Sequence, residues 1–243
     1  MIRLIGLIAA LVCAAGPVRA QDWKTTIEKA QATTFSGCYI GAQVGYGATN
    51  YDTSLDVIAP APFGGTALQA PFSSQGGSIG AHVGCDMQIQ KFIVGAFADY
   101  SWLSQKMEVT SPLLAGLGGG ALNPIARIDL DTSWTVGGRA GLVIAPSTAA
   151  YVLLGYTKMT TSDGFTLLGT ASGTFAMPSF EGWTYGGGLM TEISKGIRLS
   201  AEYRYTRFDR VDVAVIPNAL SIGIQPDMHT AMARLSYSFN FGQ

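Results

Sequence analysis

Charged residues make up only 13% of this 243-residue chain, and several recur at every second position of an apolar or glycine-rich stretch. Glu202 and Arg204, for example, alternate with Ala201, Tyr203 and Tyr205. A period of two is the pattern of a β-strand with two different faces. A charge buried on such a face persists only when it is paired, so we predict a network of salt bridges and hydrogen bonds. Its predicted members are Asp99, Arg139, Glu192, Arg198, Glu202, Arg204 and Arg234, with His82 and Asp86 on the same face.

The only two histidines, His82 and His229, are the candidates for acid-base chemistry. His229 stands two residues after Asp227, so it could act as a general base beside a carboxylate. Such catalysis also needs a nucleophile or an activated water in fixed geometry, and nothing in the sequence singles out a serine for that role. We therefore predict no enzymatic activity, and we assign His82 to hydrogen bonding on the charged face.

No metal or cofactor site is predicted. Two isolated histidines and two distant cysteines do not have the spacing of a structural metal site. The glycine strings at 118–120 and 186–188 lack both a following helix and the lysine of a phosphate-binding loop. The formal net charge of −1 also argues against nucleic acid as a partner, because its phosphates require clustered basic residues.

The first twenty residues have the features of a secretory signal peptide. A short positive start precedes the apolar stretch 4–15, and Val18-Arg19-Ala20 has the small-x-small form of a cleavage site, so we predict cleavage after Ala20. The alternative is a short hydrophobic anchor. Export would leave two cysteines, Cys38 and Cys85, which lie near the same end of two predicted strands and share one face. They are a possible disulfide, the alternative being two small apolar residues that face lipid.

Eight stretches from residue 36 onward alternate with period two, and the connections between them are alternately short and long. The predicted strands are 36–48, 76–89, 92–104, 132–145, 149–161, 181–193, 197–209 and 228–241. The long connections are 50–75, 105–130, 162–180 and 210–227. Short turns at one end and long loops at the other are typical of transmembrane barrels.

We therefore predict an all-β fold: an eight-stranded antiparallel up-and-down transmembrane β-barrel with four long extracellular loops and three short periplasmic turns. The expected organisation is a signal peptide at 1–20, a periplasmic N-terminal tether at 21–35 and the barrel at 36–243.

The direction of the two strand faces distinguishes a membrane barrel from a soluble one. A soluble barrel is apolar inside, whereas lipid requires the apolar face outside. Aromatic residues such as Tyr46, Trp102, Trp134 and Trp183 stand near strand ends of the apolar faces, as in the girdles found at bilayer interfaces. The opposite faces carry too many charges for a dry ligand cavity, so we predict that the charges point inward. We assign the 31 glycines to a narrow, tightly curved wall.

Several segments together resemble the porin-like outer-membrane β-barrel family, which includes the opacity-type and OmpA-type eight-stranded barrels and the abundant outer-membrane proteins of α-proteobacteria. The similarity covers residues 36–241 and rests on the segments 37–47, 76–80, 94–100 and 201–205. Phe97 departs from the inward acidic residue that members often carry, so one lumen pairing is expected to be missing. Members usually end on an aromatic residue read by the barrel-assembly machinery. Here Phe239 and Phe241 are implied as that signal, although the chain continues to Gln243.

The resemblance implies an integral protein of the outer membrane of a Gram-negative bacterium, in contact with outer-membrane lipid and lipopolysaccharide. We predict a structural envelope role, with the long loops exposed to an external ligand that the sequence does not identify. The first alternative is a narrow porin that passes ions or small solutes. The second is an enzyme that modifies outer-membrane lipid.

Overall fold

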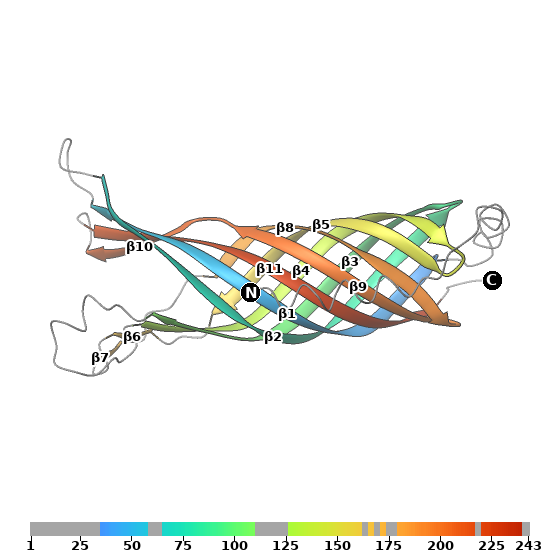
Figure 1. The fold of residues 1–243 in the computed structure, drawn as a ribbon, viewed down its shortest axis with the longest axis horizontal. Coiled ribbons are helices and arrows are strands. Elements are labelled where there is room, and N and C mark those ends of the chain that lie inside the picture. Colours follow the sequence, from blue (N-terminus) through green and yellow to red (C-terminus); the bar gives the residue numbers. More distant parts are fainter. Residues whose placement is uncertain are drawn as a thin grey trace, which may run out of the picture.

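The chain folds into a closed antiparallel β-barrel (Figure 1). The computed structural model describes residues 35–57, 65–109, 126–161, 165–167, 171–173, 179–216 and 220–239. Eight long strands form the wall in chain order, and pairing of the last with the first closes the ring. These strands are β1 (Gly37–Val57), β2 (Gly65–Ile89), β3 (Phe92–Val109), β4 (Ala126–Ala145), β5 (Thr148–Thr161), β8 (Phe180–Ser194), β9 (Ile197–Phe208) and β11 (Leu220–Phe239).

The three short turns lie together at one end of the barrel, which we call the turn end, and the opposite end is the loop end (Figure 1). Strands β2 and β3 meet at Gln90, which has a positive φ of 57°, and β8 and β9 meet at Gly196, whose φ of 77° favours glycine. The predicted eight-stranded antiparallel barrel is confirmed. The signal peptide at 1–20 and residues 21–34 of the predicted tether lie outside the described residues.

Five of the eight wall strands, β1, β2, β3, β4 and β11, extend well beyond their predicted ends on the loop side, whereas β5, β8 and β9 end within one residue of the prediction. Strand β1 continues to Val57 and β2 starts at Gly65, so most of the expected loop 50–75 is a paired hairpin. The expected loops 105–130 and 210–227 likewise contain strand, including the additional β10 (Val211–Ile216), which pairs with β11. A small hairpin, β6 (Phe165–Leu167) with β7 (Ala171–Gly173), lies within the expected loop 162–180. Above a membrane both strand faces contact water, so the alternation that identifies a half-buried strand fades.

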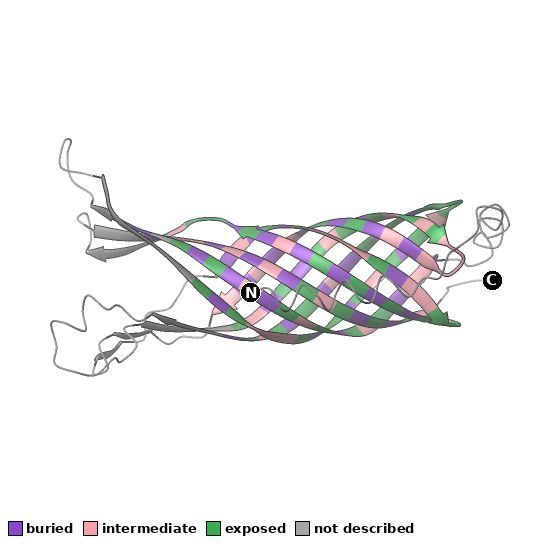
Figure 2. Ribbon diagram, viewed as in Figure 1, coloured by how far each residue is buried: buried purple, intermediate pink, exposed green. Residues whose placement is uncertain are grey.

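Buried and exposed side chains alternate along the wall (Figure 2). The exposed face carries large aliphatic and aromatic residues such as Ile79, Val152 and Leu235, each more than half exposed at 60%, 65% and 52%. The buried face is rich in polar and charged residues. A soluble barrel would show the opposite arrangement, so the barrel has the surface of a protein embedded in lipid. Among the described residues, no helix is long and apolar enough to cross a membrane.

Cys38 and Cys85 form a disulfide between neighbouring positions of β1 and β2. Their Cα atoms lie 3.9 Å apart, and the two residues share the outward face with Ile40 and Val83. The bond stands near the turn end, beside Phe239 of the closing strand β11. It therefore fixes the β1–β2 register next to the seam at which the barrel closes.

Removal of this disulfide by the double substitution Cys38→Ser and Cys85→Ser should destabilise the folded barrel. The bond closes a segment of 47 residues, for which the chain-entropy model gives about 4 kcal/mol, with 2–4 kcal/mol typical of measured cases. Urea unfolding of the refolded protein measures the difference, and reduction of the wild-type protein should produce the same shift. Coincident unfolding curves, or two free thiols in the non-reduced protein by mass spectrometry, would contradict the assignment.

Candidate functional site in the barrel lumen

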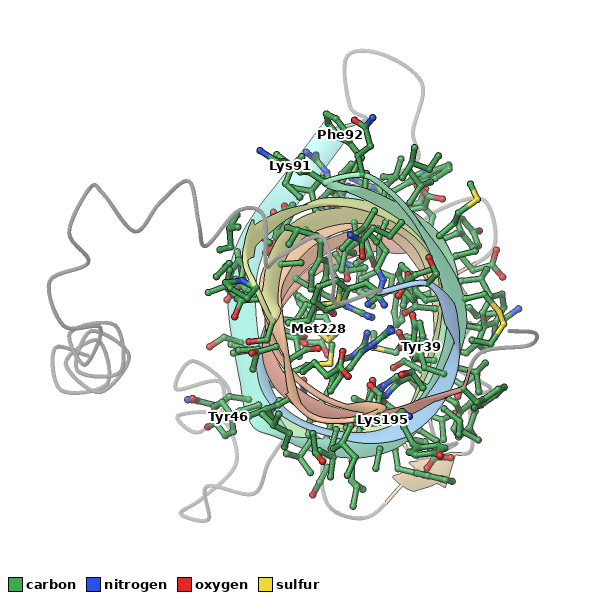
Figure 3. All side chains as sticks on the ribbon, turned by 90° about the vertical axis from the view of Figure 1, so that its right-hand side faces the viewer. Tyr39, Tyr46, Lys91, Phe92, Lys195 and Met228 are labelled. Carbon is green, nitrogen blue, oxygen red and sulfur yellow. A yellow bond between two sulfur atoms is a disulfide. The ribbon has the colours of Figure 1, made fainter. Side chains whose placement is uncertain are left out.

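A layer of charged side chains fills the middle of the lumen. Figure 3, a view along the barrel axis from the turn end, shows side chains from the wall occupying the interior. Seven of these side chains are charged and buried: Asp86, Asp99, Arg139, Arg198, Glu202, Arg204 and Arg234. They come from five strands, and every pairing between them described below, except Glu202 with Arg204, joins different strands. We call this set the charge layer.

Asp86 of β2 holds the part of the charge layer nearer the turn end. Its carboxylate accepts two hydrogen bonds from Arg139, one of them from Nε at 2.9 Å. Nη1 of Arg198 lies 3.4 Å from the same carboxylate. A bidentate guanidinium–carboxylate pair fixes both distance and orientation, so the pair links β2 firmly to β4, two strands away.

Asp99 and Glu202 hold the other part of the charge layer. Nη2 of Arg204 and of Arg234 lie 2.8 and 2.7 Å from the same Asp99 oxygen. The Glu202 carboxylate accepts a hydrogen bond from Nε of Arg204. Its other oxygen lies 3.4 Å from Nη1 of Arg234. The Tyr151 hydroxyl donates a hydrogen bond of 2.6 Å to Glu202. Two carboxylates and two guanidiniums thus neutralise each other where water is scarce, which is the condition for keeping such charges buried.

Aromatic rings support the guanidiniums of the charge layer. Arg139 lies 4.7 Å from the centroid of the Tyr39 ring and 5.2 Å from that of Tyr151, distances that allow cation–π attraction. Arg204 and Arg234 lie over Phe97 at 5.2 and 5.9 Å. Phe97 therefore places a ring face against the two arginines that share Asp99.

Not every predicted member belongs to the charge layer. Glu192 is only partly buried, and its carboxylate accepts the backbone N–H of Gly196 in the β8–β9 turn. The prediction placed Glu192 on the correct strand face but did not consider its position along the barrel axis. Glu192 lies near the end of β8, so its side chain contacts the turn and not the charge layer. His82 lies inside the lumen, where Nε2 is 2.9 Å from the Ser236 hydroxyl. Among the described residues, no group of three or more acidic, histidine or cysteine side chains could hold a metal ion.

Apolar side chains cover the charge layer on both sides. The cluster toward the turn end consists of Phe35, Ile93, Phe97, Ala149, Tyr151, Leu153 and Met190, of which Phe97 and Tyr151 also reach into the charge layer. Phe35 precedes the first strand, is fully buried, and donates its backbone N–H to Gln88. The cluster toward the loop end consists of Met159, Phe180, Phe208 and Met228. We call these the lower and upper apolar layers.

Hydroxyl groups line the wall between the charge layer and the upper apolar layer. Thr135, Thr157, Thr184 and Thr206 of four successive strands form a ladder, with oxygens 2.9, 2.5 and 2.8 Å apart. We did not predict this threonine ladder, nor the roles of Tyr39, Tyr151 and Phe35. Thr135, Thr184 and Thr206 alternate with outward residues in the predicted strands, but a hydroxyl carries no charge that would draw attention to it. The stretch around Tyr151 fits either strand register from sequence alone, and Phe35 precedes the first predicted strand.

Outside the lumen, aromatic and charged side chains mark the loop-end rim. Lys158 lies 2.8 Å from Glu181, which also accepts a hydrogen bond of 2.7 Å from Tyr156. On the next strands around the ring, β9 and β11, the Tyr203 hydroxyl is 2.7 Å from Nδ1 of His229. Trp183 and Tyr203 are more than half exposed, at 51% and 53%, as expected of rings at a membrane–water interface.

Comparison with known proteins identifies the family. The profile of the family described as outer membrane protein beta-barrel domain matches residues 7–241. The chain belongs to this family. Membership places this outer-membrane β-barrel in the outer membrane of a Gram-negative bacterium and confirms the family predicted from the sequence.

The chain is also similar to several solved structures. The outer membrane protein OprG from Pseudomonas aeruginosa is 13% identical, with 85% of this chain and 97% of that chain covered at a TM-score of 0.50. Neisserial surface protein A is 14% identical, with coverages of 84% and 98% and a TM-score of 0.44. Ail of Yersinia pestis is 15% identical, with coverages of 82% and 99% and a TM-score of 0.34. A comparison with curated proteins finds no match.

Inward-facing glycines leave the space that the charge layer fills. A methyl group added at Gly95 of β3 would overlap the carboxylate of Asp86, and one at Gly186 of β8 would lie 3.1 Å from Cγ of Arg204. The prediction assigned the glycines to wall curvature. At these positions they also make room for long polar side chains from the neighbouring strand.

Substitution of an inward-facing glycine should therefore lower the free energy of unfolding, whereas substitution of an outward-facing glycine should leave it nearly unchanged. Gly95→Ala should displace Asp86 from Arg139 and lower the free energy of unfolding by about 3 kcal/mol, the range for breaking a buried ion pair. Gly138→Ala is the matched control on the next strand, because its methyl group would face outward, 3.6 Å from the nearest atom, the carbonyl oxygen of Gly95. We expect it to change stability by at most about 0.5 kcal/mol. Equal effects in urea unfolding would contradict this explanation.

Proposed function

We propose that this outer-membrane β-barrel is a structural, non-conducting component of the envelope that anchors surface-exposed hairpins and loops. The observation that carries the proposal is the charge layer, in which buried guanidiniums and carboxylates pair across the lumen between two apolar layers. A barrel with this interior is a solid plug held in lipid by its apolar outer face. Its contribution to the envelope is mechanical attachment and display.

The pairing in the charge layer opposes conduction in a specific way. A permeating ion needs a continuous file of water or of polar groups free to replace its hydration shell. Asp99 is already engaged by two arginines, and Asp86 by Arg139 with Arg198 alongside. An ion could pass only by breaking these pairs, which costs several kcal/mol per buried charge. Eight strands also enclose an interior only wide enough for side chains to fill.

The outer wall supports an integral rather than a peripheral location. The backbone groups of all eight wall strands pair around the ring, which lipid requires because it offers no hydrogen bonds. The outward face presents its apolar residues to hydrocarbon, and its rim presents rings and charges to head groups, in line with contact to outer-membrane lipid and lipopolysaccharide. Recognition by the barrel-assembly machinery through Phe239 and Phe241 stays a proposal. Phe239 lies on the outward face at the end of β11, and Phe241 lies outside the described residues.

The geometry around His229 supports a non-enzymatic role. Nε2 of His229 is 3.7 Å from the Asp227 carboxylate, too far for the hydrogen bond that would orient a catalytic imidazole. Asp227 instead accepts a hydrogen bond of 3.2 Å from Asn50, and Nδ1 of His229 is occupied by Tyr203. The four side chains Asn50, Asp227, His229 and Tyr203 form a contact between β1, β9 and β11.

Planar-bilayer recordings test the proposed function. The refolded protein should insert, show a heat-modifiable gel shift that reports a closed barrel, and give no reproducible open level. The variant Arg204→Ala with Arg234→Ala is the matched sample, because removal of two large side chains opens the charge layer and should produce measurable conductance. A stable open level in the wild-type protein would favour the narrow porin instead. Release of fatty acid from lipid A in the same membranes would favour the lipid-modifying enzyme.

A further inference from the structure

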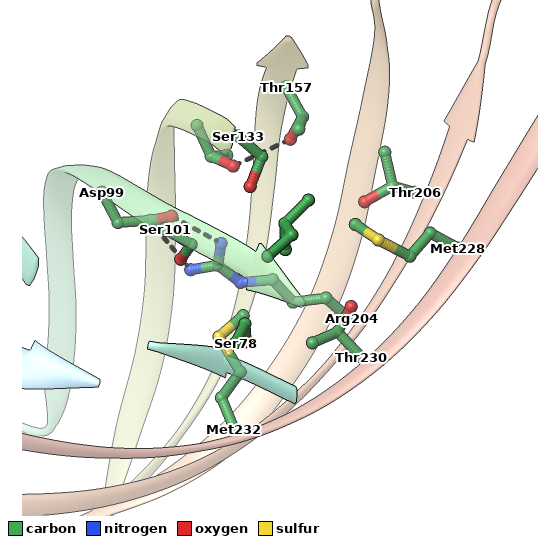
Figure 4. A pocket seen from close by; sticks show the side chains of 12 residues that line it. Ser78, Asp99, Ser101, Ser133, Thr157, Arg204, Thr206, Met228, Thr230 and Met232 are labelled. Carbon is green, nitrogen blue, oxygen red and sulfur yellow. Dashed lines mark hydrogen bonds and ion pairs between the residues drawn. The ribbon is translucent and has the colours of Figure 1, made fainter. Parts of the chain in front are cut away.

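A small cavity lies in the lumen on the loop side of the charge layer. Its volume is about 20 Å³. Asp99 and Arg204 form its floor, Leu103 and Met228 contribute apolar surface, and hydroxyl groups from several strands form the rest of its lining (Figure 4). We call this cavity the hydroxyl chamber.

The hydroxyl chamber contains hydrogen-bonding groups that the described residues do not satisfy. Thr230 is buried, and its hydroxyl has no hydrogen-bond partner among the described residues. The Ser101 hydroxyl accepts a hydrogen bond of 2.7 Å from the Gln43 amide, which leaves its own proton without an acceptor among those residues. Buried polar groups in native proteins are almost always bonded to protein or to ordered water.

The threonine ladder adds one more available donor. Its four hydroxyls carry four protons but make three contacts with each other, so one proton has no acceptor within the ladder. Three of the four residues, Thr135, Thr157 and Thr206, line the hydroxyl chamber. A ligand in the chamber must therefore accept hydrogen bonds from hydroxyl groups, and it can also donate one to Thr230.

Charge and size select the ligand. Arg204 and Asp99 in the lining neutralise each other, and Asp99 is further engaged by Arg234, so the hydroxyl chamber has no charge left to attract an ion. A neutral ligand that both donates and accepts fits the hydroxyls. A cavity needs roughly 10–15 Å³ of this kind of volume to hold one water molecule.

We propose that the hydroxyl chamber is a binding site for an internal water molecule, which joins Thr230 of β11 to the hydroxyls of the opposite wall. The water would connect strands β3 and β11 with the threonine ladder of β4, β5, β8 and β9. It completes the polar layer beneath the upper apolar layer. The site does not depend on the proposed function, because such a water would be bound in a closed barrel and in a conducting one.

The substitution Thr230→Val tests the site, because it removes the hydroxyl while it preserves the volume and the β-branched shape. If Thr230 bonds to an internal water, the variant loses that bond and its folding equilibrium constant should fall about five- to thirtyfold. If the chamber is dry, the substitution removes an unsatisfied buried hydroxyl, and the barrel should be equally stable or more stable. The sign of the change in urea unfolding separates the two cases.

A second measurement detects the water directly. In nuclear magnetic resonance spectra of the refolded full chain, the methyl groups of Thr206 and Thr230 should show cross-peaks to a slowly exchanging water. Thr184→Val is the matched control: it removes a ladder hydroxyl that does not line the chamber, so the cross-peak to Thr230 should persist. Absence of these cross-peaks in the wild-type protein, or a Thr230→Val barrel as stable as the wild type, would overturn the proposal.

Discussion

The rest of the structure depends on the pairing of buried guanidiniums with buried carboxylates in the charge layer. An unpaired charge in a low-dielectric interior costs several kcal/mol, so each arginine must find its carboxylate at hydrogen-bond distance. Asp86 with Arg139, and Asp99 with Arg204 and Arg234, meet this condition in the observed strand register. The apolar outer face sets the inside and outside of the wall but tolerates a slip of two residues, whereas the ion pairs do not. Inward glycines leave space for these long side chains. Aromatic rings pack against the guanidinium groups.

Much of the fold could be predicted from the sequence, because lipid imposes a strict rule on every strand that crosses it. The alternation of Leu199, Ala201 and Tyr203 with Arg198, Ser200 and Glu202 identifies both the strand and its inward face. The turns near Gln90 and Gly196 were equally clear. The strand extensions to Val57 and from Gly65 were not predictable, since that rule ends where the strands leave the bilayer and both faces meet water.

The candidate site was predictable as a set of residues but not as a set of contacts. Strand parity placed Asp99, Arg139 and Arg234 inside, yet parity says nothing of height along the barrel axis. The position of a side chain along the barrel axis depends on the register between neighbouring strands, and strand parity does not determine that register. This is why Glu192 was expected among the charges and instead bonds to Gly196 in a turn. Paired charges and apolar side chains fill the lumen, and this filling supports the proposed role of attachment and display.

The most direct test of this account is a double-mutant cycle on Asp86 and Arg139, with Asp86→Asn, Arg139→Gln and the double variant unfolded in urea. The account predicts that each single variant is strongly destabilised, because it leaves a buried charge without its partner. The double variant should be less destabilised than the sum of the two, with a coupling energy of at least about 1 kcal/mol. Additive effects, with no coupling between the two positions, would contradict the claim that paired charges hold the lumen together.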